Sequence, residues 1–233
     1  MRAVYRAEAG LDGAVREFGH LHHDVGFMRL ISSGASFRMT GNDLSRKRTM
    51  LAANLPAGRF NPLGFIRARN DDKAGRAIID CMMNLLCRAG DCSGDPRFRS
   101  IAMARADTAM KHFVREDGSC NHIVVFNPDA MAVENIPAGQ GYAPDSSWSR
   151  GRSWTLYGFT LGCLHTGKTE YLATARKAAD SFISQVRGDW APRCDLRQPE
   201  GNPLRDACAG AVAACLRWPG WTSPGRRNAS GRR

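Results

Sequence analysis

Apolar residues recur with helical spacing along most of the chain, and turn-forming residues separate the resulting segments. Gly41 and Gly167 each follow such a segment, at the position where a glycine commonly ends a helix. Asn42 or Asp43 is suited to cap the segment after Gly41, and Pro56 is suited to end it. The pattern predicts helices over residues 23–39, 44–55, 74–87, 96–114, 148–164, 169–186 and 204–216.

A strand pattern is confined to residues 121–126 (NHIVVF), which follow an Asp-Gly turn. Helical segments joined by turns favour helical hairpins, in which each helix packs against the next. Because the sequence holds no short repeat, we expect a closed helical toroid rather than a regular solenoid. The pattern of apolar positions therefore predicts an all-α protein.

The composition is that of an ordinary globular protein. The chain has 233 residues, of which 43% are hydrophobic and 24% are charged, and these fractions exclude a disordered chain, a collagen-like repeat or a coiled coil as the main structure. No apolar run reaches the ~20 residues of a membrane span, and residues 1–13 lack the apolar core of a secretory signal. We expect a cytoplasmic protein with one domain over residues 1–216 and a basic, disordered tail over 217–233.

The positive charge changes this picture little. The formal net charge is +11, but the segment after Cys215 contains five arginines and no acidic residue, which accounts for nearly half of the excess. A basic tail can bind nucleic acid without sequence preference, yet a segment rich in Pro, Gly, Ser and Arg is more often a solvated chain end. We therefore expect no nucleic-acid partner.

The cysteines and histidines do not form a metal-binding pattern. The eight cysteines contain no C-x2-C pair, and Cys120 and His122 lie too close together for a zinc knuckle. A free cysteine in an apolar helix acts as a small hydrophobic residue, so reduced thiols are expected. His22 and His23 are adjacent, and two adjacent histidines on a helix cannot face one metal ion. We therefore expect no metal, and a hydrogen-bonding role for His23.

Asp80 has surroundings that are unusual for a charged side chain. It lies between Ile78, Ile79, Cys81 and Met82, with no Lys or Arg among its immediate neighbours. Burial of a carboxylate without a partner costs several kcal/mol. Asp80 is therefore either held by a hydrogen bond from a neighbouring helix or part of a functional site.

Asp145 follows the glycine-rich segment GQGYAP and precedes an apolar helix. One role for it is the N-cap of that helix. Glycines, Gln140, Tyr142 and Trp148 in one loop also suit a sugar site, because aromatic faces stack on sugar rings and amides bind hydroxyl groups. Arg150 follows in the first turn of the helix and is suited to pair with Asp145 or with an anionic ligand.

Six segments carry a resemblance that extends in order over about residues 20–215. They are HHDVGFM (22–28), GRFNPLGFIRARN (58–70), IIDCMMNL (78–85), DTAMKHFVREDGSCNHIVVF (107–126), GQGYAPDSSWSRGRSWTLYGFTLGCLHTGKTEYL (139–172) and PRCDLRQP (192–199). Together they resemble the unsaturated glucuronyl hydrolases, glycoside hydrolase family 88, and the block GYAPDSSWSRG is specific.

The resemblance implies a six-hairpin (α/α)6 toroid that acts on oligosaccharides left by polysaccharide lyases. Such enzymes remove a Δ4,5-unsaturated uronic acid from the non-reducing end by hydrating its C4=C5 double bond, without a metal or an organic cofactor. By resemblance, Asp145 is the general acid and base, and Asp80 is the second essential carboxylate. The expected substrate-binding residues are His23, Gln140, Tyr142, Trp148 and Arg150.

The length of the chain accommodates about seven of the twelve helices of such a toroid, so we expect an incomplete toroid and a truncated or frame-shifted end after Cys215. Unpaired inner helix faces would favour self-association. Two alternatives stay open at this point. One is an unsaturated rhamnogalacturonyl hydrolase, which shares the toroid and the paired aspartates, and the other is a catalytically inactive remnant.

Overall fold

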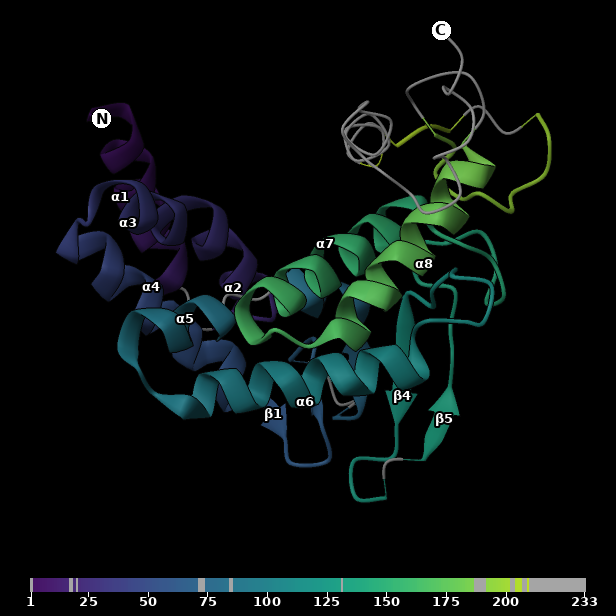
Figure 1. The fold of residues 1–233 in the computed structure, drawn as a ribbon, viewed down its shortest axis with the longest axis horizontal. Helices are drawn as coiled ribbons and strands as arrows, with labels where there is room; N and C mark the ends of the chain where they lie inside the picture. The colour runs from purple at the N-terminus through teal and green to yellow at the C-terminus, as the bar shows by residue number, and fades with distance from the viewer. Residues whose placement is uncertain are drawn as a thin grey trace, which may run out of the picture.

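The computed structural model describes residues 2–16, 19, 21–70, 74–83, 86–130, 132–186, 192–201, 204–206 and 209. Helices make up most of this part of the chain, and consecutive helices pack against each other, α5 against α6 and α7 against α8 (Figure 1). The helices are α1 (Arg2–Arg16), α2 (Asp24–Arg29), α3 (Ala35–Thr40), α4 (Asp43–Gly58), α5 (Leu86–Ser93), α6 (Pro96–His112), α7 (Ser149–Thr166) and α8 (Thr169–Gln185).

α2 and α3 form one continuous helical segment, because the π-turn η2 (Leu30–Gly34) joins them without a break. The helix predicted over 23–39 is thereby confirmed, and Gly41 ends it with a φ of 69°, a backbone conformation that is accessible to glycine. The side-chain oxygen of Asn42 accepts a hydrogen bond at 2.9 Å from the backbone amide three residues later, as a helix cap does. Gly167 ends α7 with a φ of 76°.

The segment 74–87, which the pattern predicts to be one helix, requires the main correction. It contains strand β3 (Arg76–Ile78) and the 3₁₀ helix η3 (Ile79–Met83), and α5 begins only at Leu86. A short apolar run that is buried on several sides has no periodicity that separates helix from strand. The pairing of β3 with a neighbouring strand decides the outcome.

The remaining helix predictions agree with the structure to different degrees. The predictions over 96–114, 148–164 and 169–186 are confirmed by α6, α7 and α8, whereas α4 continues past Pro56 and α1 is not predicted at all. Within 204–216, residues 204–206 are not helical, and most of the others lie outside the described residues. With α2, η2 and α3 counted as one, the described residues contain the expected seven α-helical segments, although not all of the predicted ones.

Two small antiparallel sheets accompany the helices. β1 (Phe60–Asn61) pairs with β2 (Phe65–Ile66), and β4 (Ile123–Phe126) pairs with both β3 and β5 (Val133–Asn135). The prediction over 121–126 is confirmed by β4. The other strands have two or three residues each, too few to display an alternating pattern in the sequence.

Two clusters of buried apolar side chains support these elements. The first lies among α6, α7, α8 and the larger sheet, and its buried rings are Phe65, Phe113, Phe126, Phe159, Tyr171 and Phe182. The second lies among α2, α4, α5 and α6, and it includes Val25, Ala53, Ile66, Leu86 and Phe98. Both clusters include side chains from residues 78–82, where β3 passes directly into η3.

That segment divides its side chains between the clusters. Ile79 and Met82 belong to the first cluster, and Ile78 and Cys81 belong to the second. Asp80 stands between residues that are buried in different clusters, and its own side chain keeps 20% of its surface exposed. The fold thereby brings a carboxyl group to the wall of a pocket from within an apolar segment.

The thiols agree with the reduced state expected from the sequence. Those that lie in the described residues are free cysteines: Cys81, Cys87, Cys92, Cys120, Cys163 and Cys194. Cys208, Cys215 and the tail over 217–233 lie outside the described residues, so the predicted domain boundary stays a prediction. Among the described helices, none is both long and apolar enough to cross a membrane.

Substitution of Phe159 tests how much the first cluster contributes to stability. Its side chain is 0% exposed, so replacement by alanine leaves a cavity among α6, α7 and α8. We expect Phe159→Ala to lower the free energy of unfolding by about 3–5 kcal/mol, measured by chemical denaturation with circular dichroism. Leu164→Ala on the same helix is the matched control, because Leu164 is 74% exposed, and its effect should stay within about 0.5 kcal/mol. Equal losses for the two variants would contradict this description of the core.

Candidate active site

A polar pocket of about 280 Å³ lies where α2, η3 and the beginning of α7 meet. Asp24 and Phe27 come from α2, and Asp80 and Met83 come from η3. The remaining lining residues come from α7 and from the loop before it, and they are Gln140, Trp148, Arg150 and Trp154. The fold therefore brings four of the predicted site residues into one pocket: Asp80, Gln140, Trp148 and Arg150.

Asp80 faces a histidine. Its Oδ2 atom lies 3.6 Å from Nε2 of His122, and both atoms are buried without a hydrogen-bond partner among the described residues. Nδ1 of His122 accepts a hydrogen bond at 2.8 Å from the backbone amide of Gln140. A neutral imidazole that accepts at Nδ1 carries its hydrogen on Nε2. His122 therefore presents an N–H group to the carboxyl group of Asp80.

His122 is absent from the predicted site. It is 6% exposed, and its ring centroid lies 4.2 Å from that of Trp148, so the pocket wall fixes its orientation. A single histidine in an apolar strand segment is more often a structural residue than a functional one. The sequence alone gave no reason to select it, because its contact with Asp80 spans two segments that only the sheet brings together.

Asp24 is the second carboxylate of the pocket, and it is also absent from the predicted residues. Its Oδ1 atom lies 3.2 Å from Nδ1 of His23. His23 does not line the pocket but is buried behind it, with 4% of its surface exposed. Burial lowers the pKa of His23 to about 4, against the opposite effect of the carboxylates of Asp24 and Asp80. His23 is therefore a neutral neighbour of Asp24 at neutral pH.

Three aromatic rings and the guanidinium group of Arg150 form much of the remaining pocket wall. The guanidinium carbon of Arg150 lies 4.9 Å from the ring centroid of Trp148, and Nη2 of Arg150 donates a hydrogen bond at 2.9 Å to Oε1 of Gln140. The rings of Phe27 and Trp154 lie 5.9 Å apart with an interplanar angle of 54°. Flat apolar faces next to fixed polar groups suit a sugar ring with an anionic substituent.

Asp145 and Tyr142 lie outside this pocket. Asp145 is exposed, and its backbone carbonyl accepts a hydrogen bond at 2.7 Å from Arg197; Tyr142 is 58% exposed. Asp145 does not cap α7 either, because Trp148 occupies the cap position. The structure therefore does not place Asp145 beside Asp80 in this pocket, since neighbouring positions in a loop can face different sides of it. The catalytic role of Asp145 stays a prediction that this geometry does not favour.

His22, His23 and Asp24 are the group in the described part of the chain that could hold a metal ion. Their ligand atoms all lie within 4.8 Å of one another. Both histidines precede the first residue of α2, so the argument that adjacent histidines on a helix diverge does not apply to them. The absence of a metal cofactor stays a prediction.

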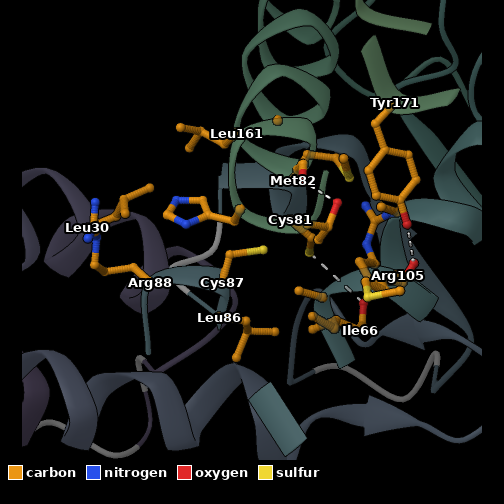
Figure 2. A pocket seen from close by; sticks show the side chains of 17 residues that line it. Leu30, Ile66, Cys81, Met82, Leu86, Cys87, Arg88, Arg105, Leu161 and Tyr171 are labelled. Atoms are coloured by element: carbon orange, nitrogen blue, oxygen red, sulfur yellow. Dashed lines mark hydrogen bonds between the residues drawn. The ribbon is translucent and has the colours of Figure 1, made fainter. Parts of the chain in front are cut away.

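The other side of η3 is apolar. Figure 2 shows Cys81 and Met82 beside a cavity of about 40 Å³ that lies among α5, α6 and α7. Arg105 also lines this cavity, and its guanidinium donates a hydrogen bond at 2.9 Å to the backbone carbonyl of Ile78. The 3₁₀ helix thus separates the small core cavity from the polar pocket, and Asp80 belongs to the polar side.

Acid should destabilise the protein through His23. An ordinary histidine in the unfolded chain has a pKa of 6.5, whereas burial lowers that of His23 to about 4. The unfolded state therefore binds more protons between these two values, and the free energy of unfolding falls as the pH is lowered through this window. The measurement is urea unfolding as a function of pH, in which His23→Gln should show a smaller loss. The same pH dependence in both proteins would contradict the buried, neutral state of His23.

The chain has relatives among known proteins, although no protein-family model matches it. It is 34% identical over 202 residues to the unsaturated glucuronyl hydrolase of Bacillus sp. (strain GL1), an alignment that covers 83% of this chain and 54% of the relative. It is 30% identical over 212 residues to the unsaturated chondroitin disaccharide hydrolase of Streptococcus pyogenes serotype M1, covering 88% of this chain and 53% of the relative.

The fold agrees with these alignments. An aspartate-to-asparagine variant of an unsaturated glucuronyl hydrolase, solved with dGlcA-Glc-Rha-Glc, matches with a TM-score of 0.85 and 31% identity over 92% of this chain and 59% of that chain. The helices described above are therefore part of a six-hairpin (α/α)6 toroid, which confirms the expected fold class. The chain spans about half the length of the curated relatives it matches, and over that length it belongs to the family of unsaturated glucuronyl hydrolases.

Proposed function

We propose that the chain carries the active site of a hydrolase that removes a Δ4,5-unsaturated uronic acid from the non-reducing end of an oligosaccharide. The observation that carries the proposal is the pocket in which two carboxylates, Asp24 and Asp80, stand with the cation of Arg150 and three aromatic rings. The proposal is supported by relatives named for unsaturated glucuronyl and chondroitin disaccharide substrates. The structure solved with dGlcA-Glc-Rha-Glc supports it as well.

The proposed reaction adds water across the C4=C5 double bond of the uronic acid. A carboxylic acid of the protein gives its proton to C4 while a water molecule attacks C5, and the resulting carboxylate takes a proton from that water. The protein group is thereby regenerated. The product is a hemiketal at C5, whose ring opens and releases the rest of the oligosaccharide. The reaction differs from retaining glycoside hydrolysis, in which a carboxylate attacks the anomeric carbon.

Asp80 is our candidate for the general acid and base. One of its carboxyl oxygens is buried and accepts no hydrogen bond at normal distance among the described residues. The N–H group of His122 faces the same oxygen at 3.6 Å, and a hydrogen-bond donor stabilises the carboxylate that remains after the proton has moved to C4. This arrangement gives Asp80 the role that the resemblance had given to Asp145.

The other pocket residues have roles in substrate binding. Asp24, which is 46% exposed, is available to accept hydrogen bonds from ring hydroxyl groups. Arg150 is the cation for the uronate carboxylate, and it is oriented by Gln140 at 2.9 Å and by Asp206 at 3.5 Å. The guanidinium lies over the ring of Trp148, which also offers an apolar face. His23 orients Asp24 from behind the pocket, and Tyr142 has no contact with the pocket that would give it a comparable role.

Self-association through exposed helix faces is part of the same proposal. Four large apolar side chains on the first helices are between 55% and 72% exposed, namely Ile31, Met39, Leu44 and Leu51. An unpaired apolar surface of this kind favours contact with another copy. A second copy of the chain would in this way cover these exposed side chains.

The reaction is followed by the ultraviolet absorbance of an unsaturated chondroitin or hyaluronan disaccharide, which is lost when the conjugated C4=C5 bond is hydrated. We expect the unchanged protein to remove this absorbance and Asp80→Asn to slow the reaction by about 10³-fold, since general acid and base catalysis contributes about 10²–10⁴-fold. Asp24→Asn should also slow it, because the amide cannot replace both acceptor oxygens. Asp145→Asn should retain activity within about threefold of the unchanged protein.

Other results of this assay would each favour a different hypothesis. A loss of activity in Asp145→Asn with full activity in Asp80→Asn would restore the role predicted from the sequence and contradict ours. Activity on unsaturated rhamnogalacturonan fragments alone would favour the rhamnogalacturonyl alternative. No activity on any unsaturated uronide, in a sample with helical circular dichroism and a cooperative unfolding transition, would favour the inactive remnant.

Substitution of Arg150 tests whether this residue binds the carboxylate of the uronic acid. Arg150→Gln keeps much of the volume but removes the charge that attracts the substrate carboxylate, so we expect KM to rise about tenfold or more while kcat changes less. The measurement is the same absorbance assay over a range of substrate concentrations. Arg176→Gln is the matched control, because Arg176 is exposed on α8, outside the lining of the pocket. An unchanged KM in Arg150→Gln would contradict the proposed contact.

A further inference from the structure

The loop that carries Gln140 and leads to Trp148 folds around a buried carboxylate from a distant part of the chain. Asp195 is 2% exposed and belongs to the segment after α8, about fifty residues beyond the loop in sequence. It does not line the pocket. It nevertheless binds the backbone of the loop that carries Gln140 and Trp148 and leads to Arg150, three residues that line the pocket.

The carboxylate of Asp195 accepts four hydrogen bonds. Oδ2 accepts from the backbone amide of Tyr142 at 3.0 Å and from the hydroxyl group of Ser146 at 2.6 Å. Oδ1 accepts from the backbone amide of Ser147 at 3.0 Å and from that of Arg197 at 2.9 Å. Three of these four donors belong to the loop, so one side chain satisfies two backbone amides and one hydroxyl group of this irregular segment.

Backbone contacts hold the two segments together beside this carboxylate. The amide of Ser149 donates to the carbonyl of Cys194 at 2.9 Å, and the amide of Leu196 donates to the carbonyl of Ser147 at the same distance. A side chain at Gly141 would meet Oδ2 of Asp195 at 3.1 Å, so the loop approaches the carboxylate closely. These bonds extend from Tyr142 to Ser149, so they begin two residues after Gln140, include the neighbours of Trp148 and end next to Arg150.

We propose that Asp195 is the positioning residue that sets the loop and thereby fixes Gln140, Trp148 and Arg150 in the pocket. The inference rests on the proposed function for its kinetic consequence, although not for its structural one. The physical reason is that a carboxylate offers only acceptors, and all of its loop partners are donors. An asparagine at this position would turn an N–H group toward donors and release part of the loop. A misplaced Arg150 and Trp148 would then bind and orient the substrate poorly.

The structural test uses hydrogen exchange of the full chain, followed by mass spectrometry. Asp195→Asn should speed exchange of the amides in the loop over residues 138–148 by about tenfold or more, while α6 and α8 keep their protection. Asp129→Asn is the matched control, since Asp129 is exposed in the turn between β4 and β5, and it should change nothing in the loop. Unchanged exchange of the loop in Asp195→Asn would overturn the proposal. If that variant fails to fold, Ser146→Ala, which removes one of the four bonds, gives the same test.

The kinetic test is a double-mutant cycle with the unsaturated disaccharide. Asp195→Asn should lower kcat/KM on the order of a hundredfold when Arg150 is present. In the Arg150→Gln background the same change should lower kcat/KM by less than about tenfold, because the guanidinium that the loop positions is already missing. A role in stability alone would give equal factors in the two backgrounds and would overturn the proposal. If the unchanged protein shows no activity, the proposed function fails, and hydrogen exchange still decides the role of Asp195 in the loop.

Discussion

A carboxylate surrounded by apolar residues in the sequence cannot be buried among them without a cost of several kcal/mol, and the architecture around Asp80 follows from this constraint. Ile79 and Met82 enter one hydrophobic cluster, and Ile78 and Cys81 enter the other. Within each of these pairs the residues are three positions apart, and such residues share one face of a helical turn. Asp80 belongs to neither cluster, and its carboxyl group lies on the wall of the polar pocket.

Most of the other pocket features depend on contacts between segments that are far apart in the chain. His122 reaches Asp80 because β4 pairs with β3, and the same histidine accepts a hydrogen bond from the amide of Gln140. Asp195 holds the other end of that loop. The pocket thus depends on three kinds of contact: the pairing of β3 with β4, the contacts of the His122 imidazole, and the hydrogen bonds of the Asp195 carboxylate.

The relatives of the chain are longer than the chain itself. The chain aligns with about half of each relative while most of its own length is covered. Within that half, the described residues already bring together two carboxylates, a cation and aromatic rings. The proposed chemistry therefore has its protein groups within this part of the toroid, whereas the exposed side chains of Leu44 and Leu51 mark surface that its own helices do not cover.

The sequence by itself determined the long helices α6, α7 and α8, the caps at Asn42 and Gly167, and the family resemblance, because these depend on local spacing and on motifs. It also singled out Asp80, Gln140, Trp148 and Arg150. Only the tertiary structure decided that the second carboxylate of the pocket is Asp24 and that Asp145 lies on the exposed side of its loop. A motif records which residues are neighbours in the chain. The face that each residue presents is set by hydrogen bonds from distant segments, and those bonds leave no periodic trace in the sequence.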